Sequence, residues 1–289
     1  MPSQCIADLD SRKSRPIVRI RILECCTWNC NCDLRESNSH EESHLLIFAI
    51  LFALSAFAAD SKTVSYQSGD ETVQGILYPP ATKGPFPALI VIHEYWGLND
   101  WVKDQASKLA DQGNVTLAVD LYRGKVTTTP DMAHERMCGV PADRAQRDFH
   151  AAFEFLAAHP NVEKSRIGSI EWCMGGGYSL DVALQEPALA ADVINYGHLA
   201  TDLDALKQIN APILGLFGAQ DRGITADDVK KFAATLDQLG KKIDVKIYDD
   251  AGHAFENPNN KDGYRASDAW DSHPSLPSRQ FENPIIRKK

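Results

Sequence analysis

The stretch Arg166–Ser179 reads RIGSIEWCMGGGYS. It predicts a buried strand, then Cys173 on a sharp turn, then the glycine-rich start of a helix. A cysteine between a strand end and a helix N-terminus has its thiolate stabilised by free backbone N–H groups and by the helix dipole. The glycines at 175–177 allow strand and helix to approach closely. The pattern is that of a nucleophile elbow with cysteine as the nucleophile. The alternative is a small, inert cysteine packed between strand and helix.

The sequence on both sides of this stretch alternates between strands and helices. An opening hairpin is predicted at 63–67 and 73–78, and amphipathic or capped helices begin near Asn99 or Asp100, at Pro141 and at Thr225, where Asp228 completes a capping box. Strands that alternate with helices form a mostly parallel central sheet with helices on both faces, the α/β class. We therefore expect one catalytic domain over residues 60–289. The remaining buried strands are predicted at 88–92, 115–119, 193–196, 213–217 and 245–248.

Two polar residues follow later strands and complete a catalytic set with Cys173. Asp221 comes directly after the strand at 213–217, and His253 lies on the loop after the strand at 245–248. The order nucleophile, acid, histidine is that of α/β-hydrolases. His253 would accept the thiol proton while Asp221 fixes the imidazole tautomer. Each residue also has a simpler interpretation, because loop histidines are often surface residues and aspartates often form turns. Asp249 and Asp250 are alternative partners for His253.

Five motifs in this order resemble the dienelactone hydrolase family of α/β-hydrolases: HEYWG (93–97), WCMGGGYS (172–179), NYGHL (195–199), GAQD (218–221) and AGHAFENP (251–258). The resemblance covers residues 63–265. It implies that Glu94 is an additional catalytic acid that helps to generate the thiolate, and that the backbone N–H groups of Tyr95 and Met174 form the oxyanion hole. It further implies hydrolysis of an enol lactone or a small ester through an acyl-cysteine intermediate, without a metal or another cofactor.

The chain departs from the family pattern at three places. Glu171 occupies a position where the family has glycine, and we expect its side chain to strain the turn or to raise the pKa of the Cys173 thiol. Asn257 stands where an arginine is expected, which leaves Arg123 and Lys125 as the cations for a substrate carboxylate. After Ala266 the tail (267–289) contains Pro274, Pro277 and Pro284, which exclude a long closing helix.

Side chains just beyond the strand ends are the candidates for substrate binding. They are Trp96, Tyr122, Arg123 and His198. Each is equally interpretable as an ordinary residue of the core or rim.

The first 59 residues differ from the rest and are interpreted as an N-terminal extension. The uncharged run at 45–59, LLIFAILFALSAFAA, resembles the hydrophobic region and cleavage site of a secretory signal; a buried core helix is the alternative. We interpret residues 1–44, which hold five of the seven cysteines, as absent from the mature protein. We expect an exported protein, with a cytoplasmic location as the alternative and membrane contact only through an uncleaved signal. A disulfide between Cys138 and Cys173 is conceivable and would silence the nucleophile.

The formal net charge of −9 argues against a nucleic-acid-binding protein. The partner expected is a small lactone or ester, and the oligomeric state, a monomer included, stays open. Together with the signal-like run, the family resemblance implies a secreted carboxymethylenebutenolidase-type esterase with a cysteine-based catalytic triad. Two alternatives stay open: an exported ligand-binding protein in which Glu171 has impaired catalysis, and a thiol-redox protein.

Overall fold

The structure is a computed structural model that describes residues 61–173 and 177–272. All of these belong to one compact unit, Phe57–Lys289. The signal-like run at 45–59, the extension 1–44, the predicted oxyanion donor Met174 and the tail from residue 273 onwards lie outside the described residues.

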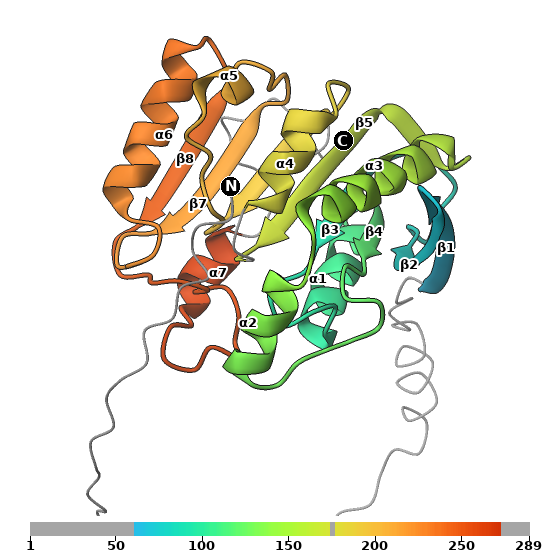
Figure 1. Ribbon diagram of the computed structural model, residues 1–289, viewed down its shortest axis with the longest axis horizontal. Helices are drawn as coiled ribbons and strands as arrows, with labels where there is room; N and C mark the ends of the chain where they lie inside the picture. The colour runs from blue at the N-terminus through green and yellow to red at the C-terminus, as the bar shows by residue number, and fades with distance from the viewer. Residues whose placement is uncertain (1–60, 174–176, 273–289) are drawn as a thin grey trace, which may run out of the picture. The chain divides into compact units, whose positions relative to one another are not determined.

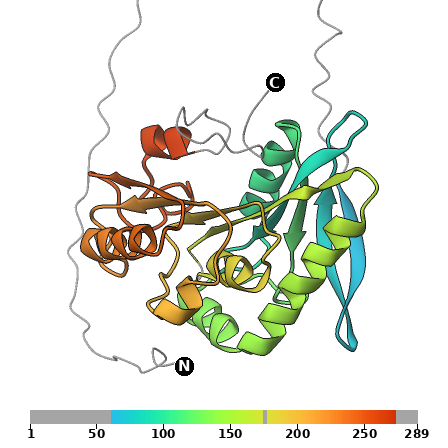
Figure 2. The same ribbon diagram turned by 90° about the horizontal axis from the view of Figure 1, so that it is seen from above.

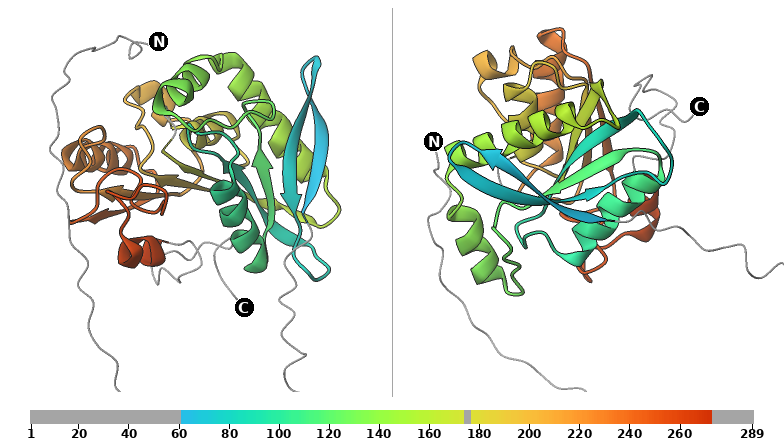
Figure 3. Two further views of the ribbon diagram at one scale, coloured as in Figure 1. Left: turned by 90° about the horizontal axis from the view of Figure 1, so that it is seen from below. Right: turned by 90° about the vertical axis from the view of Figure 1, so that its right-hand side faces the viewer.

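The described residues form one twisted sheet with the strand order β1-β2-β4-β3-β5-β6-β7-β8 (Figure 1). β2 pairs antiparallel with β1 and with β4, and all further neighbours are parallel. The β1–β2 hairpin therefore forms one edge of the sheet, as Figure 3 shows. The strands are β1 (Lys62–Ser68), β2 (Glu71–Tyr78), β3 (Phe86–Ile92), β4 (Val115–Val119), β5 (Val162–Trp172), β6 (Ala191–Asn195), β7 (Ile213–Gly218) and β8 (Ile243–Tyr248).

Helices cover both faces of the sheet, which confirms the predicted α/β architecture. Figure 2 shows α1 and α7 on one face and α3, α4 and α6 on the other. Both faces of β3 and β4 are covered in this way, so their residues are almost all buried and read as continuous apolar runs. The helices are α1 (Asp100–Asp111), α2 (Pro130–Cys138), α3 (Ala142–Ala158), α4 (Tyr178–Gln185), α5 (Leu203–Leu206), α6 (Ala226–Gln238) and α7 (Ala266–Ser272).

The start of α1 illustrates why these helices begin where they do. The Asn99 side chain accepts a hydrogen bond from the Val102 N–H at 3.1 Å, which satisfies one of the free donors of the first turn. Trp101, Val102, Ala106, Leu109 and Ala110 then form the face that packs on the sheet. The predicted cap of α6 is also present, since Thr225 Oγ1 accepts from the Asp228 N–H at 3.2 Å.

Three elements were not predicted from the sequence. α2 buries only Ala133, so it lacks the apolar periodicity by which a helix is recognised. α5 has only four residues. The chain after Arg265 forms the short helix α7, which agrees with the exclusion of a long helix but shows that the tail is not wholly without one. No helix among residues 61–173 and 177–272 is long and apolar enough to span a membrane.

Candidate active site

The candidate site lies at the carboxyl ends of the parallel strands, where the chain repeatedly adopts an unusual backbone conformation. The described non-glycine residues with positive φ are Arg123 after β4, Cys173 after β5, Tyr196 after β6 and Ala254 after β8. Such conformations cost of order 1–3 kcal/mol each and persist where surrounding contacts enforce them. At Cys173, φ is 63°, as expected of a side chain raised on a nucleophile elbow.

Glycine is required on the helix side of this elbow. Gly177 has a φ of 64°, and a Cβ there would collide with the carbonyl oxygen of His198. The Cys173 N–H donates to the Asn195 carbonyl at 3.0 Å, which ties the turn to the end of β6. The sulfur is therefore held at a fixed place above the sheet.

The structure brings Cys173, His253 and Asp221 together. The His253 Nε2 atom lies 3.0 Å from Cys173 Sγ, and its Nδ1 lies 2.7 Å from Asp221 Oδ2. The second oxygen of Asp221 accepts the N–H groups of Gly223 and Ile224. Burial would raise the pKa of Asp221, but the hydrogen bond from His253 and these N–H donors hold the pKa below its usual value. Asp221, rather than Asp249 or Asp250, is thus the carboxylate that orients the imidazole.

Cys173 is a free, partly exposed cysteine, so it forms no disulfide with Cys138, a pairing that the sequence left open. A Cys138–Cys173 disulfide would have favoured a thiol-redox protein, and the structure does not contain that pairing. The pKa of the Cys173 thiol is raised well above its usual value, first by burial and then by the carboxylates of Glu94 and Glu171. The Tyr95 backbone N–H opposes this effect and lowers the pKa. The resting Cys173 side chain is therefore a neutral thiol, which would need a base to act as a nucleophile.

Glu94 is buried at the end of β3 and is held by a neutral partner. The Asn257 amide donates to Glu94 Oε2 at 2.6 Å, and both side chains are almost fully buried. Burial raises the pKa of Glu94 to about 8; the Asn257 hydrogen bond lowers it and the nearby Glu256 raises it. Glu94 therefore carries a proton at neutral pH.

Glu171 is fully buried beneath the elbow, where its carboxylate packs against Gly197. Its pKa is raised well above the usual value by burial and by Asp192 and Asp181, against a smaller effect of the Ser179 and Tyr178 N–H groups at the start of α4. Glu171 also raises the pKa of the Cys173 thiol, which is one of the two effects expected from the sequence. Among the described residues neither carboxylate oxygen has a hydrogen-bond partner of good geometry.

Two of the four predicted substrate-binding residues have other partners. The Arg123 guanidinium binds Asp148 at 2.7 Å and Glu71 at 3.0 Å, so it is not available for a substrate carboxylate, contrary to expectation. The Tyr122 ring is buried and its hydroxyl donates to the Tyr95 carbonyl at 3.1 Å.

Trp96 and His198 remain accessible at the site edge. Trp96 is half-buried and packs on the Tyr95 ring with a centroid distance of 4.4 Å. His198 is exposed, and its backbone rather than its side chain supports the elbow.

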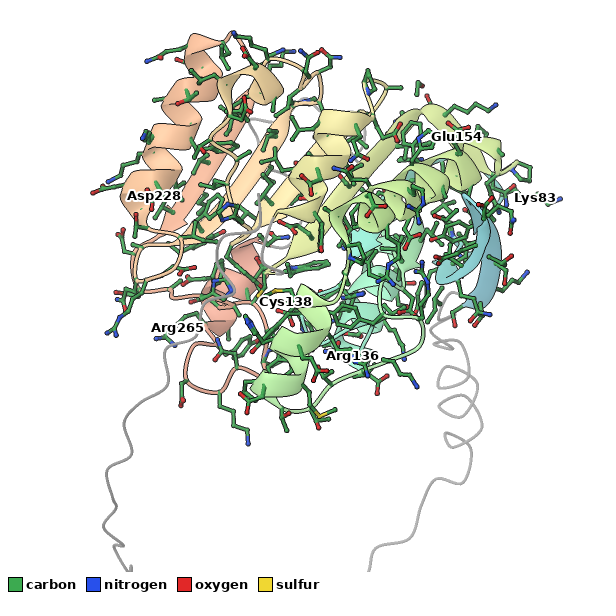
Figure 4. The ribbon with its side chains drawn as sticks, in the orientation of Figure 1. Lys83, Arg136, Cys138, Glu154, Asp228 and Arg265 are labelled. Atoms are coloured by element: carbon green, nitrogen blue, oxygen red, sulfur yellow. The ribbon has the colours of Figure 1, made fainter. Side chains whose placement is uncertain are left out.

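The sequence did not single out the cation on α2. Arg136, labelled in Figure 4 together with Cys138 on the same helix, is exposed, and its charge partly opposes the burial that raises the pKa of the Tyr122 phenol. Arg265, also labelled, uses its guanidinium on the carbonyl oxygens of Asp250, Asp262 and Tyr264. Among residues 61–173 and 177–272, no group of three or more His, Cys, Asp or Glu side chains is arranged to hold a metal ion.

The strand order, the elbow and the three assembled side chains define an α/β-hydrolase. Residues 73–276 match the model of the dienelactone hydrolase family, and the chain belongs to that family.

Named relatives agree with this membership. Two carry the name "putative carboxymethylenebutenolidase": one from Methylorubrum extorquens is 33% identical over 66% of this chain and 70% of its own length, and one from Aquifex aeolicus is 31% identical over 72% and 94%. A crystal structure described as a dienelactone hydrolase-like promiscuous phosphotriesterase from metagenomic libraries has a TM-score of 0.68 at 25% identity, covering 74% of this chain and 93% of its own. The chain is accordingly a lactone or ester hydrolase.

Proposed function

We propose that this hydrolase cleaves small, uncharged lactones or esters through an acyl-cysteine intermediate on Cys173. The observation that carries the proposal is the contact of 3.0 Å between Cys173 Sγ and His253 Nε2, with Asp221 on the opposite imidazole nitrogen. A thiol with a raised pKa is a poor nucleophile until a base removes its proton, and His253 is in reach to do so.

In the proposed reaction His253 takes the thiol proton as sulfur attacks the substrate carbonyl. The Tyr95 N–H, whose proximity lowers the pKa of the Cys173 thiol, would stabilise the oxyanion of the tetrahedral intermediate. Collapse breaks the bond to the alcohol oxygen, which receives the proton from His253; in a lactone this oxygen stays attached to the acyl chain. Water, deprotonated by His253, then attacks the thioester and releases the acid and the thiol.

The side chains around the sulfur favour an uncharged substrate because they supply little positive charge. Glu94 and Glu171 lie near it, Asn257 takes the place of the expected arginine, and Arg123 is bound to Asp148 and Glu71. A substrate carboxylate would therefore lose its hydration beside buried carboxyl groups, with little positive charge from these side chains to compensate. If an anionic substrate is preferred, Arg136 is the residue to test as the partner of its carboxylate.

The proposal is tested with p-nitrophenyl acetate, a neutral enol lactone and a carboxylate-bearing enol lactone. Turnover that disappears in Cys173→Ala, with mass spectrometry detecting an acyl group on Cys173 of the parent, is the expected result. Turnover that survives in Cys173→Ala would refute the assignment of Cys173 as the nucleophile. A kcat/KM that is higher for the carboxylate-bearing lactone than for the neutral one, with this preference lost in Arg136→Gln, would refute the proposal that the substrate is uncharged. The alternative of a catalytically impaired binding protein gains no support from the comparisons and predicts no turnover at all.

We also propose that the protein is exported, on the basis of the signal-like run at 45–59. Intact mass of the protein recovered from the cell exterior or periplasm should place the mature N-terminus near Ala59 or Asp60. Recovery of the uncleaved chain from the cytoplasm alone would contradict this.

A further inference from the structure

The loop that follows β3 carries Glu94 and Tyr95, and its backbone is held by hydrogen bonds within the loop and from the loop that follows β4. Three successive carbonyl groups of the first loop accept hydrogen bonds: Glu94 from the His93 ring at 2.7 Å, Tyr95 from the Tyr122 hydroxyl at 3.1 Å, and Trp96 from the Thr127 N–H at 2.9 Å. Thr127 Oγ1 adds a second, longer contact to Trp96 at 3.3 Å. Such repeated bonding of one short segment fixes the orientation of each peptide plane.

His93 connects the two loops directly. Its Nδ1 faces the Glu94 carbonyl, an acceptor, and its Nε2 lies 3.3 Å from the Leu121 N–H, a donor. Only the neutral tautomer with its proton on Nδ1 makes both bonds. The ring is fully buried, and burial lowers the pKa of His93, which maintains this neutral form. The edge of the same ring packs on Tyr122, with centroids 4.7 Å apart.

Peptide geometry transmits this restraint to the reacting sulfur. In a trans peptide the C=O of one residue and the N–H of the next point in opposite directions. The Glu94 carbonyl points to His93 and also accepts the Gly97 N–H at 3.0 Å. The N–H of the same peptide group, that of Tyr95, must then point the other way, toward Cys173, whose thiol pKa it lowers.

We propose that His93 is a positioning residue that, together with Tyr122, fixes the Glu94–Tyr95 peptide so that the Tyr95 N–H points at the substrate oxyanion. This inference rests on the proposed cysteine mechanism. It gives Tyr122 a role in the reaction that needs no contact with substrate. It also explains why the residue before Glu94 is a buried histidine rather than an apolar residue that continues β3: the ring supplies one donor and one acceptor in a site closed to water.

The test uses His93→Phe, which keeps a flat ring and removes both hydrogen bonds, and His93→Gln, whose amide offers one donor and one acceptor. With p-nitrophenyl acetate we expect His93→Phe to lower kcat about 100-fold, the effect of losing one oxyanion donor, with KM changed less than about two-fold. His93→Gln should recover much of this loss. Tyr122→Phe should lower kcat about ten-fold. Tyr264→Phe, at an exposed tyrosine, is the control and should leave kcat unchanged.

A second readout separates positioning from general damage to the fold. An aldehyde forms a hemithioacetal whose oxyanion needs the Tyr95 N–H, whereas iodoacetamide alkylation at pH 10 forms no oxyanion and depends on this N–H only through its minor effect on the thiol pKa. We expect His93→Phe to weaken aldehyde inhibition about as much as it lowers kcat and to alkylate at nearly the parental rate. Equal losses in both assays, or an unchanged kcat, would overturn the proposal.

Two controls complete the design. If His93→Phe does not fold, as judged by its melting temperature, Tyr122→Phe decides: an unchanged kcat overturns the proposal, and a loss confined to kcat and aldehyde affinity supports it. Cys173→Ala is measured beside them. Activity that survives in Cys173→Ala removes the proposed function itself, whereas an inactive Cys173→Ala beside a fully active His93→Phe refutes only the role of His93.

Discussion

The Asn257 amide donates to Glu94 at 2.6 Å, in a position where the family resemblance predicts an arginine. An amide satisfies one carboxyl oxygen but brings no positive charge. Burial therefore raises the pKa of Glu94 to about 8, and the residue is a neutral acid near pH 7. In this chain Glu94 is thus better suited to donate a proton or a hydrogen bond than to act as a resting base.

The raised pKa of Glu94 predicts a pH dependence of stability. The unfolded carboxyl ionises above its usual value of 4.5 while the folded one keeps its proton until about pH 8, so the free energy of unfolding falls as pH rises across this range. Glu94→Gln removes this contribution. We expect the variant to gain stability relative to the parent between pH 5 and pH 8, on the order of a few kcal/mol.

Urea unfolding at several pH values measures this gain. Glu154→Gln, at the exposed glutamate labelled in Figure 4, is the control and should show no pH-dependent gain. Asp192 and Asp181, with pKa values of about 7 and about 6, act in the same direction, so part of the pH dependence should remain in Glu94→Gln. Parallel pH profiles for the parent and Glu94→Gln would contradict the buried, protonated carboxyl.

Glu171 provides the second prediction. Because this buried carboxylate disfavours the Cys173 thiolate, Glu171→Gln should shift the pH dependence of iodoacetamide alkylation to lower pH and raise kcat/KM near neutral pH. Glu171→Gly also removes the side chain that packs against Gly197. If only the glycine variant reacts faster, bulk rather than charge is the cause, and the electrostatic explanation fails.

The third prediction concerns Asp221, which orients His253 and also caps its own loop. Asp221→Asn keeps an oxygen for the N–H groups of Gly223 and Ile224 but loses the charge that stabilises the imidazolium. We expect kcat to fall about 10²- to 10⁴-fold with little change in melting temperature. A comparable fall in melting temperature would show that the residue mainly supports the loop.

The sheet and the grouping of Cys173, Asp221 and His253 could be predicted from the sequence because their signals are local. The apolar runs at 88–92 and 115–119 lie within β3 and β4, and residues that follow strand ends meet at one edge of a parallel sheet. The partners of Arg123 could not be predicted, because Glu71 and Asp148 are distant in sequence and come together only when the β1–β2 hairpin and α3 pack on the sheet. For α2, burial of a single alanine leaves no periodic pattern to detect.

The same reasoning explains why the roles of His93 and Tyr122 were missed. Both residues act on backbone carbonyls, and a sequence gives no indication of where a carbonyl points. The one signal for such a role in the sequence was a polar residue, His93, directly after the buried strand β3.

The fourth prediction tests the revised role of Arg123. Its guanidinium binds Asp148 through two nitrogens, and Ser68 Oγ donates to the same carboxylate at 2.6 Å. Arg123→Met would leave the buried Asp148 without its counter-charge, at a cost of about 3 kcal/mol in unfolding free energy. Arg147→Met, which breaks an exposed pair with Asp143, should cost less than about 1 kcal/mol.

Kinetics of the same variant distinguish structural support from substrate binding. If Arg123 only joins the β1–β2 hairpin to α3, its removal lowers stability and leaves KM for a carboxylate-bearing lactone unchanged at a temperature where the variant is folded. If it binds the substrate carboxylate, KM for that lactone rises while KM for p-nitrophenyl acetate does not. We expect the first result, because a guanidinium already bound to two carboxylates would have to give one up to bind a third.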